Sequence, residues 1–221
     1  MGVVSKSVRE DSMDSQESVD DKKTSAKKTG VSEDQQLVSS EKNQSADVHL
    51  GIRFIAYLVD WYLGALVTSL PTALFAQKLY GDVTQQNILT FEAPYGLIAG
   101  ALSLLCAILY FVILPAFVWE GQTPGKRLFH LKIVAANGSR ASLGQLLLRQ
   151  VIGIIVVEGA LVTASATLRN VVQLTFGISL AYGLYVGIVV SLVSVALLWF
   201  TKDHRALHDF IGTTKVVRAA Q

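Results

Sequence analysis

The sequence predicts an all-α membrane protein: a four-helix transmembrane bundle with a small cytoplasmic two-stranded β element and a disordered N-terminal tail. Composition is the first reason, because 51% of the 221 residues are hydrophobic and only 16% are charged. A mean hydropathy of +0.44 is too high for an ordinary soluble domain. The second reason is that four apolar stretches are long enough to cross a bilayer, and the third is that a long polar segment precedes them.

Residues 1–47 are expected to form a disordered cytoplasmic tail ahead of a transmembrane domain that covers 48–221. The tail is rich in Ser, Asp, Lys, Glu and Gln and nearly free of aromatic residues. It therefore cannot bury enough apolar surface to offset the entropy lost on ordering. No cleavable signal is expected, because the first apolar run begins only near Ile52. Two interpretations stay open for the tail: a docking segment for a cytoplasmic protein partner, or an inert solvated segment.

The expected spans follow from length. A helix needs about 20 mostly apolar residues to cross a bilayer, because each residue adds only ~1.5 Å to a path of ~30 Å. The stretches that qualify lie at about 52–76, 95–118, 146–168 and 175–200. Pro71 is expected to kink or end the first span.

Orientation follows from the basic residues of the short loops, which are retained on the cytoplasmic side of a membrane. The loop between the second and third spans is the most basic, with Lys126, Arg127, Lys132 and Arg140. The segment after the last span is also basic, with Lys202, Arg205, Lys215 and Arg218. Both termini and the middle loop are therefore predicted to be cytoplasmic. Lys126 and Arg127 are expected to contact anionic lipid headgroups.

Two short segments have strand composition, 131–135 in the middle loop and 213–217 near the end of the chain. Asn137 and Gly138 mark a turn after the first of them. We expect the two segments to pair as a small cytoplasmic sheet. A two-stranded sheet is marginal alone, so it should pack on the helices.

The first span carries two charged residues, Arg53 and Asp60. Arg53 lies at the predicted edge of the span, where its long stem can reach headgroups. Asp60 lies seven residues further on, ~10 Å deeper by helical rise. A charged aspartate at mid-span costs about 2.5–3.5 kcal/mol, so something must offset it. Asp60 is therefore either protonated or directed to the bundle interior with a partner.

Helical spacing places Arg53, Tyr57, Asp60 and Gly64 on one face of the first span. Tyr57 is expected to donate a hydrogen bond to Asp60. This face either packs against other helices and holds them through polar contacts, as a polar clamp, or it carries a carboxylate that handles an ion or a proton. Glu158, which small residues surround in the third span, either shares a cation or proton with Asp60 or is hydrated near the outer interface.

Three segments in order carry a family resemblance: "RFIAYLVDWYL", "WEGQTPGKRLFHLKIVAANGSRASLGQLLLR" and "TKDHRALHDFIGTTKVV". Together they resemble the RDD family of bacterial integral membrane proteins, named for one arginine and two aspartates. The resemblance implies that Arg53 is the arginine and that Asp60 and Asp209 are the aspartates. We expect a clamp between Arg53 and Asp209 that ties the start of the first span to the end of the last. Transport of unidentified ligands has been suggested for the family.

No enzyme chemistry is expected. His208 beside Asp209 comes without a nucleophile motif or metal-ligand spacing, and a lone Cys106 excludes an internal disulfide or a thiolate cluster. Catalytic residues, metals, cofactors and nucleic-acid partners are therefore expected to be absent. The expected partner is the lipid bilayer of a bacterial cell membrane. A homo-oligomer is a further expectation, because four helices make a narrow conduit and glycines such as Gly96 and Gly100 permit close helix approach.

The sequence leaves two functions open. In the first, the protein is a multi-pass membrane protein that transports an unidentified ligand or ion, with Arg53, Asp60 and Asp209 as polar-clamp or ion-handling residues. In the alternative, it is a non-transporting scaffold or accessory protein that recruits a partner through its N-terminal tail.

Overall fold

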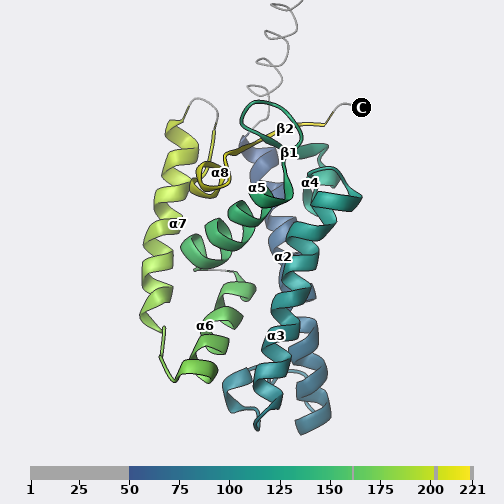
Figure 1. The fold of residues 1–221 in the computed structure, drawn as a ribbon, viewed down its shortest axis with the longest axis vertical. Coiled ribbons are helices and arrows are strands. Elements are labelled where there is room, and N and C mark those ends of the chain that lie inside the picture. The colour runs from purple at the N-terminus through teal and green to yellow at the C-terminus, as the bar shows by residue number, and fades with distance from the viewer. Residues whose placement is uncertain (1–49, 161, 202–203, 220–221) are drawn as a thin grey trace, which may run out of the picture. The chain divides into compact units, whose positions relative to one another are not determined.

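The computed structural model describes residues 50–160, 162–201 and 204–219, and most of them are helical (Figure 1). The predicted disordered tail, residues 1–47, lies outside the described residues. Three helical stretches in the described part are long and apolar enough to cross a membrane, and a fourth crossing requires a bent pair of helices. The expected membrane protein is therefore confirmed, whereas a regular four-helix bundle is not.

The first span is α2, Leu50–Tyr80, which is longer than predicted at both ends. The helix does not end at Pro71 but continues through it. Thr72 lies directly after the proline and donates its hydroxyl to Ser69 O at 2.7 Å. The apolar residues of this helix extend through the whole span, so burial in lipid favours one continuous helix across the lost backbone hydrogen bond.

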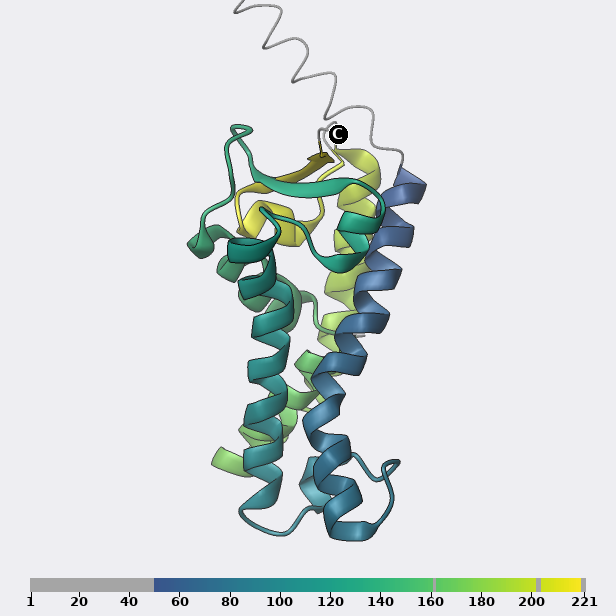
Figure 2. The ribbon, with the colours of Figure 1, turned by 90° about the vertical axis from the view of Figure 1, so that its right-hand side faces the viewer.

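The second span begins as α3, Tyr95–Ile108, after a short helix η1, Ile88–Thr90. It continues without interruption as a π-helix, η2, Leu109–Val118. The combined range is the predicted one. α2 and α3 run side by side (Figure 2).

The expected third span, 146–168, is broken. α5 (Leu143–Leu147) and the π-helix η3 (Leu148–Glu158) form its first part, α6 (Thr163–Phe176) forms the second, and the two parts meet at an angle of 71°. Gly159 ends η3, and a Cβ at this position would collide with the side chain of Ser165 in the first turn of α6. This close packing at the bend is the local reason that the span does not continue as one rod.

The last span is α7, Tyr182–Phe200, which starts later than the predicted residue 175. α6 takes up the residues before it and ends at Gly177, whose φ of +70° is left-handed and typical of a helix C-terminus.

Several of the glycines that could support a homo-oligomer pack against other parts of the same chain, and the homo-oligomer itself stays a prediction. A Cβ at Gly64 would collide with Phe111, and one at Gly100 would collide with Val171. Gly187 lies against Ala160. These close approaches are used between the helices of one chain, so they give no support to an oligomer interface.

The predicted strand pair is confirmed. β1 (Leu131–Ala135) and β2 (Thr214–Arg218) are antiparallel, with Leu131 opposite Arg218 and Ala135 opposite Thr214. Leu131, Ile133 and Val216 are buried in one cluster with apolar residues of α2, η2 and α5. The sheet therefore packs on the helices, which provides the support that two strands need.

Two short helices accompany the sheet, α4 (Pro124–Leu128) and α8 (Leu207–Ile211). In Figures 1 and 2 both lie with the sheet at one end of the described domain, where α2 also begins. Residues from the start, middle and end of the domain therefore meet in one region. This region holds the site described below.

Gly121 gives a test of how tightly the loop before α4 packs on the sheet. Its φ is +88°, and a Cβ would collide with Ile133 O. We expect Gly121→Ala to cost about 1–2 kcal/mol for the left-handed backbone and about 1–3 kcal/mol more for the collision. Gly177→Ala is the matched control, because its φ is +70° and nothing lies within 4 Å. Equal thermal-unfolding midpoints for the two variants would contradict this packing.

Candidate functional site

Asp60 of α2 lies in the protein interior, with only 3% of its surface exposed. Its carboxylate accepts hydrogen bonds from the Gly125 backbone N–H at 2.7 Å and from Lys126 Nζ at 2.9 Å. The hydroxyls of Thr123 and Tyr110 also donate to it, the latter at 3.5 Å. Of the two alternatives that the sequence allows, the structure therefore shows an aspartate directed inward with a cationic partner.

The sequence 123–126 explains how the donors reach Asp60. Thr123 precedes α4 in an extended conformation and Pro124 occupies the first turn, where a missing N–H has no cost. A Cβ at Gly125 would collide with Ala56 O and would lie 2.8 Å from the Asp60 carboxyl carbon. Only glycine therefore lets this backbone approach α2 closely enough to donate to Asp60.

Two expectations about this cluster need correction. The phenol that donates to Asp60 belongs to Tyr110 of η2, whereas Tyr57 is 40% exposed and makes no such bond in the described region. Lys126 was expected at lipid headgroups, but its side chain is only 12% exposed and pairs with Asp60. Arg127 is exposed, with its guanidinium 4.9 Å from the centre of the Trp119 ring. Its contact with headgroups stays a prediction.

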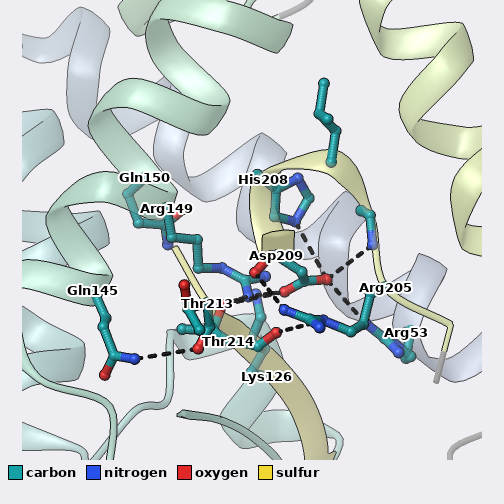
Figure 3. Close-up of polar contacts among 12 residues, drawn as sticks. Arg53, Lys126, Gln145, Arg149, Gln150, Arg205, His208, Asp209, Thr213 and Thr214 are labelled. Atoms are coloured by element: carbon teal, nitrogen blue, oxygen red, sulfur yellow. Dashed lines mark hydrogen bonds and ion pairs between the residues drawn. The ribbon is translucent and has the colours of Figure 1, made fainter. Parts of the chain in front are cut away.

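The second cluster surrounds Asp209 of α8, which is completely buried (Figure 3). Arg149 of η3 forms an ion pair with it, and Arg53 Nη2 lies 3.5 Å from its Oδ2. The Ala206 N–H donates to the same oxygen at 3.1 Å, and Thr214 of β2 accepts from Arg149 at 3.0 Å. The expected contact between Arg53 and Asp209 is therefore present, and Arg149 makes it a three-residue clamp.

The arginines control the ionisation of Asp209. Burial alone would raise the pKa of its carboxyl. The positive charge of Arg149, with smaller contributions from His208 and Arg53, outweighs burial and lowers the pKa to about 2. Asp209 is therefore a carboxylate at neutral pH, and the clamp is an ion pair.

The third cluster joins Glu158, at the end of η3, to His208 of α8. His208 Nδ1 lies 2.9 Å from Glu158 Oε2, and the His208 backbone N–H donates to Glu158 Oε1 at 2.8 Å. Ser194 of α7 donates to the same carboxylate at 2.7 Å. Glu158 is thus paired with His208, and its side chain is only 13% exposed. Of the two alternatives that the sequence left open, this arrangement matches neither a site shared directly with Asp60 nor a freely hydrated carboxylate.

His208 connects the second and third clusters, because its Nε2 lies 4.0 Å from Asp209 Oδ2. Gly153 of η3 makes room for it, since a Cβ there would lie 2.7 Å from His208 Cβ. α8 therefore presents neighbouring residues, His208 and Asp209, to two different buried partners.

A cavity of about 40 Å³ lies among the clusters. Its lining includes one acidic and three basic or titratable side chains, Asp60, Lys126, Arg149 and His208. Thr68 and Gln150 also line it. Among the residues that the structure describes, Thr68 Oγ1 and Gln150 Oε1 are buried without a hydrogen-bond partner. Ionisable side chains therefore border a cavity whose exposed surface is mainly apolar, beside the transmembrane helices.

Comparison with known proteins places this arrangement in a family. The model of the RDD family matches residues 48–213, which include Arg53, Asp60 and Asp209. The chain belongs to the RDD family. A relative of this RDD protein is the uncharacterized protein YckC of Bacillus subtilis strain 168, which is 33% identical over 115 residues. That match covers 52% of the chain and 58% of YckC, and no solved structure matches.

Arg149 is the main residue of these clusters that the sequence of this RDD protein did not predict. It is only 3% exposed and forms an ion pair with Asp209. A signal was available, because Arg149 and Gln150 directly follow the apolar run "LLL" at the start of the third stretch. The expectations above place Arg149 in no loop and give it no partner.

The clamp at Asp209 predicts a specific pH dependence. A carboxyl whose folded-state pKa is about 2, against an ordinary 3.8, stabilises the fold above pH 3.8. This contribution, about 2 kcal/mol, is lost as pH falls from about 4 to about 2. Denaturation of the RDD protein in detergent between pH 6 and 2 should show this loss.

Asp209→Asn should be less stable at neutral pH by about 3–5 kcal/mol, because Arg149 is left buried without its counterion. The variant should also lose the acid-dependent step. Asp82→Asn, which removes an exposed carboxylate in the loop after α2, is the control and should keep that step. An Asp209→Asn variant with the wild-type pH profile would show that Asp209 is not the titrating group.

Proposed function

We propose that this RDD-family protein transports an ion or small solute across the membrane and that the transport is linked to a proton exchanged at the Asp60 and His208 clusters. The observation that carries the proposal is the set of ionisable side chains, Asp60, Lys126, Arg149 and His208, around one cavity between the helices. Ionisable groups inside membrane proteins are costly and typically mark ion pathways or proton relays.

The broken third span supports the same proposal. Irregular backbone at membrane depth is tolerated where it is covered by protein or lines a cavity, and broken helices are typical of transporter binding sites. Val162, Thr163 and Ala164, at the start of α6, line this cavity. The two π-helices line it as well, through Phe111 of η2 and Gln150 of η3. π-helical turns are frequent at functional sites.

Proton uptake would change the bonds at Asp60. The charged carboxylate holds Lys126 of α4 to α2 at 2.9 Å. A protonated Asp60 would no longer neutralise the Lys126 ammonium, and the hold of α2 on α4 would weaken. Protonation therefore provides a switch between a closed and a loosened arrangement of the helices around the cavity, which is the coupling that a proton-linked transporter needs.

We also propose which end of the molecule faces the cytoplasm. α2 begins at the end of the molecule that carries the sheet, and Ala219 donates a hydrogen bond to His130 O beside the same sheet. A chain that enters and leaves at one end fits an even number of crossings, with the bent pair as one span. The basic loops of this end favour a cytoplasmic location.

The test is ion flux in proteoliposomes, with an enclosed pH-sensitive dye and imposed gradients of protons, monovalent cations and anions. We expect flux from the wild type and at least a tenfold lower rate from Asp60→Asn. Asp60→Asn/Lys126→Gln removes the carboxylate without leaving an unpaired ammonium, so it should fold and still lack flux. Asp82→Asn, an exposed aspartate, should transport like the wild type.

Two outcomes would decide against the proposal. Wild-type flux equal to that of empty vesicles under every gradient would remove transport and leave the non-transporting scaffold as the function. A folded Asp60→Asn/Lys126→Gln variant with wild-type flux would show that the cluster serves only to hold the fold.

A further inference from the structure

Arg169 of α6 is a half-buried cation without a counterion among the residues that the structure describes. The acidic residues of the described spans are Asp60 and Glu158, and they already pair with Lys126 and His208. Charged groups at membrane depth are costly and normally have a partner. The positive charge of Arg169 is therefore left for a partner outside the chain.

Arg169 lies in the part of α6 that follows the bend, about 10 Å by helical rise from the end of the helix at Phe176. Gly183, at the start of α7, leaves room for it, since a Cβ there would lie 3.4 Å from Arg169 Cδ. In Figure 1 the end of α6 and the start of α7 lie away from the sheet. If the sheet is cytoplasmic, as proposed, Arg169 lies in the outer half of the membrane.

The protein holds the guanidinium by one of its nitrogens. Arg169 Nη1 donates to Ser165 Oγ at 2.9 Å and to Gly159 O at 3.3 Å. Gly159 ends η3, where a cation interacts favourably with the negative end of the helix dipole. These two bonds anchor the planar group at the bend and fix its orientation, but they leave its other edge unused.

That other edge, formed by Nε and Nη2, is free to bind a ligand. In the described part of the chain neither nitrogen donates to another residue. Neither is among the buried atoms without a partner, in contrast to Arg149 Nε, so both reach the surface.

The chemistry of this edge defines the ligand. The N–H groups of Nε and Nη2 are parallel donors, whose spacing matches two oxygens of a carboxylate or a phosphate. A metal ion would be repelled by the guanidinium, and a neutral molecule would leave its charge uncompensated. The free edge of Arg169 therefore favours an oxyanion.

We propose that Arg169 binds an oxyanion, a carboxylate or phosphate group, through Nε and Nη2 in the outer half of the membrane. The group comes either from a solute that enters from water or from the headgroup of a lipid. A solute bound there would lie beside the bend, and residues 162–164, which follow the bend, line the cavity. The use of the site by a transported anion rests on the proposed function, whereas the site itself does not.

Solid-state NMR of the full-length wild type tests the site through the dipolar coupling between arginine ¹³Cζ and ³¹P. Arg169 is assigned from its cross-peaks to Ser165 and Gly183, so no substitution is needed. In galactolipid bilayers, which contain no phosphorus, inorganic phosphate is the probe. In phosphatidylglycerol bilayers without free phosphate, the headgroup is the probe. Two charge-assisted hydrogen bonds should place phosphorus about 4 Å from Arg169 Cζ.

Arg140 is the internal control in the galactolipid sample, because it is exposed and its Nη1 lies 3.7 Å from Glu120 Oε1. We expect at least fivefold more dephasing by phosphate at Arg169 than at Arg140, which identifies a site for a free oxyanion. The short distance in phosphatidylglycerol alone would identify the lipid as the source. A phosphorus contact in neither sample would overturn the proposal.

Anion flux in proteoliposomes tests the use of the site by a solute, with imposed gradients of phosphate and acetate. Arg169→Lys keeps the positive charge and loses the paired donors, so it should lower the rate at least fivefold relative to Arg140→Lys. Wild-type flux in a folded Arg169→Lys protein would overturn this use. A phosphate contact at Arg169 with no flux from the wild type under any gradient would overturn the proposed transport and leave the site standing.

Discussion

The burial of the Asp60 carboxylate is the constraint on which the site depends. A carboxylate on an apolar helix is tolerated only if the protein supplies donors and a counter-charge. The chain meets this requirement with residues that lie 50 to 66 positions further along, from Tyr110 to Lys126. The turn after the second span must therefore fold back onto α2, and this places α4 and the start of β1 at one end of the helices. One buried charge thus accounts for the position of a whole loop.

Asp209 repeats the principle at the other end of the chain. It binds Arg53 and Arg149, so that α2, η3 and α8 meet at one carboxylate, and Thr214 of β2 completes the contact. Because the pairing of β1 with β2 joins the loop before the third stretch to the end of the chain, the two aspartates lie in one continuous region. Arg53 contacts Asp209 there, Asp60 contacts Lys126, and the cavity that Asp60 and Lys126 line lies beside them.

The sequence predicted features that depend on local pattern and failed for those that depend on distant partners. The length of the apolar stretches predicted three of the spans, and strand composition predicted both strands of the sheet. Helical spacing, however, relates only residues of the same helix, which is why Tyr57 was preferred to Tyr110 as the donor to Asp60. The charge of Lys126 indicated lipid headgroups because the sequence does not show that Gly125 allows close approach to α2. The break after Glu158 could not be predicted, since the packing of Gly159 against Ser165 exists only in the folded bend.

The central claim is that Asp60 is held in the interior by its own ion pair with Lys126. A double-mutant cycle between Asp60→Asn and Lys126→Gln, measured as free energies of unfolding in a lipid-like environment, tests it most directly. The account predicts that either single variant costs about 3–5 kcal/mol and that the two together cost clearly less than their sum. Additive costs, with no coupling between the two residues, would contradict it.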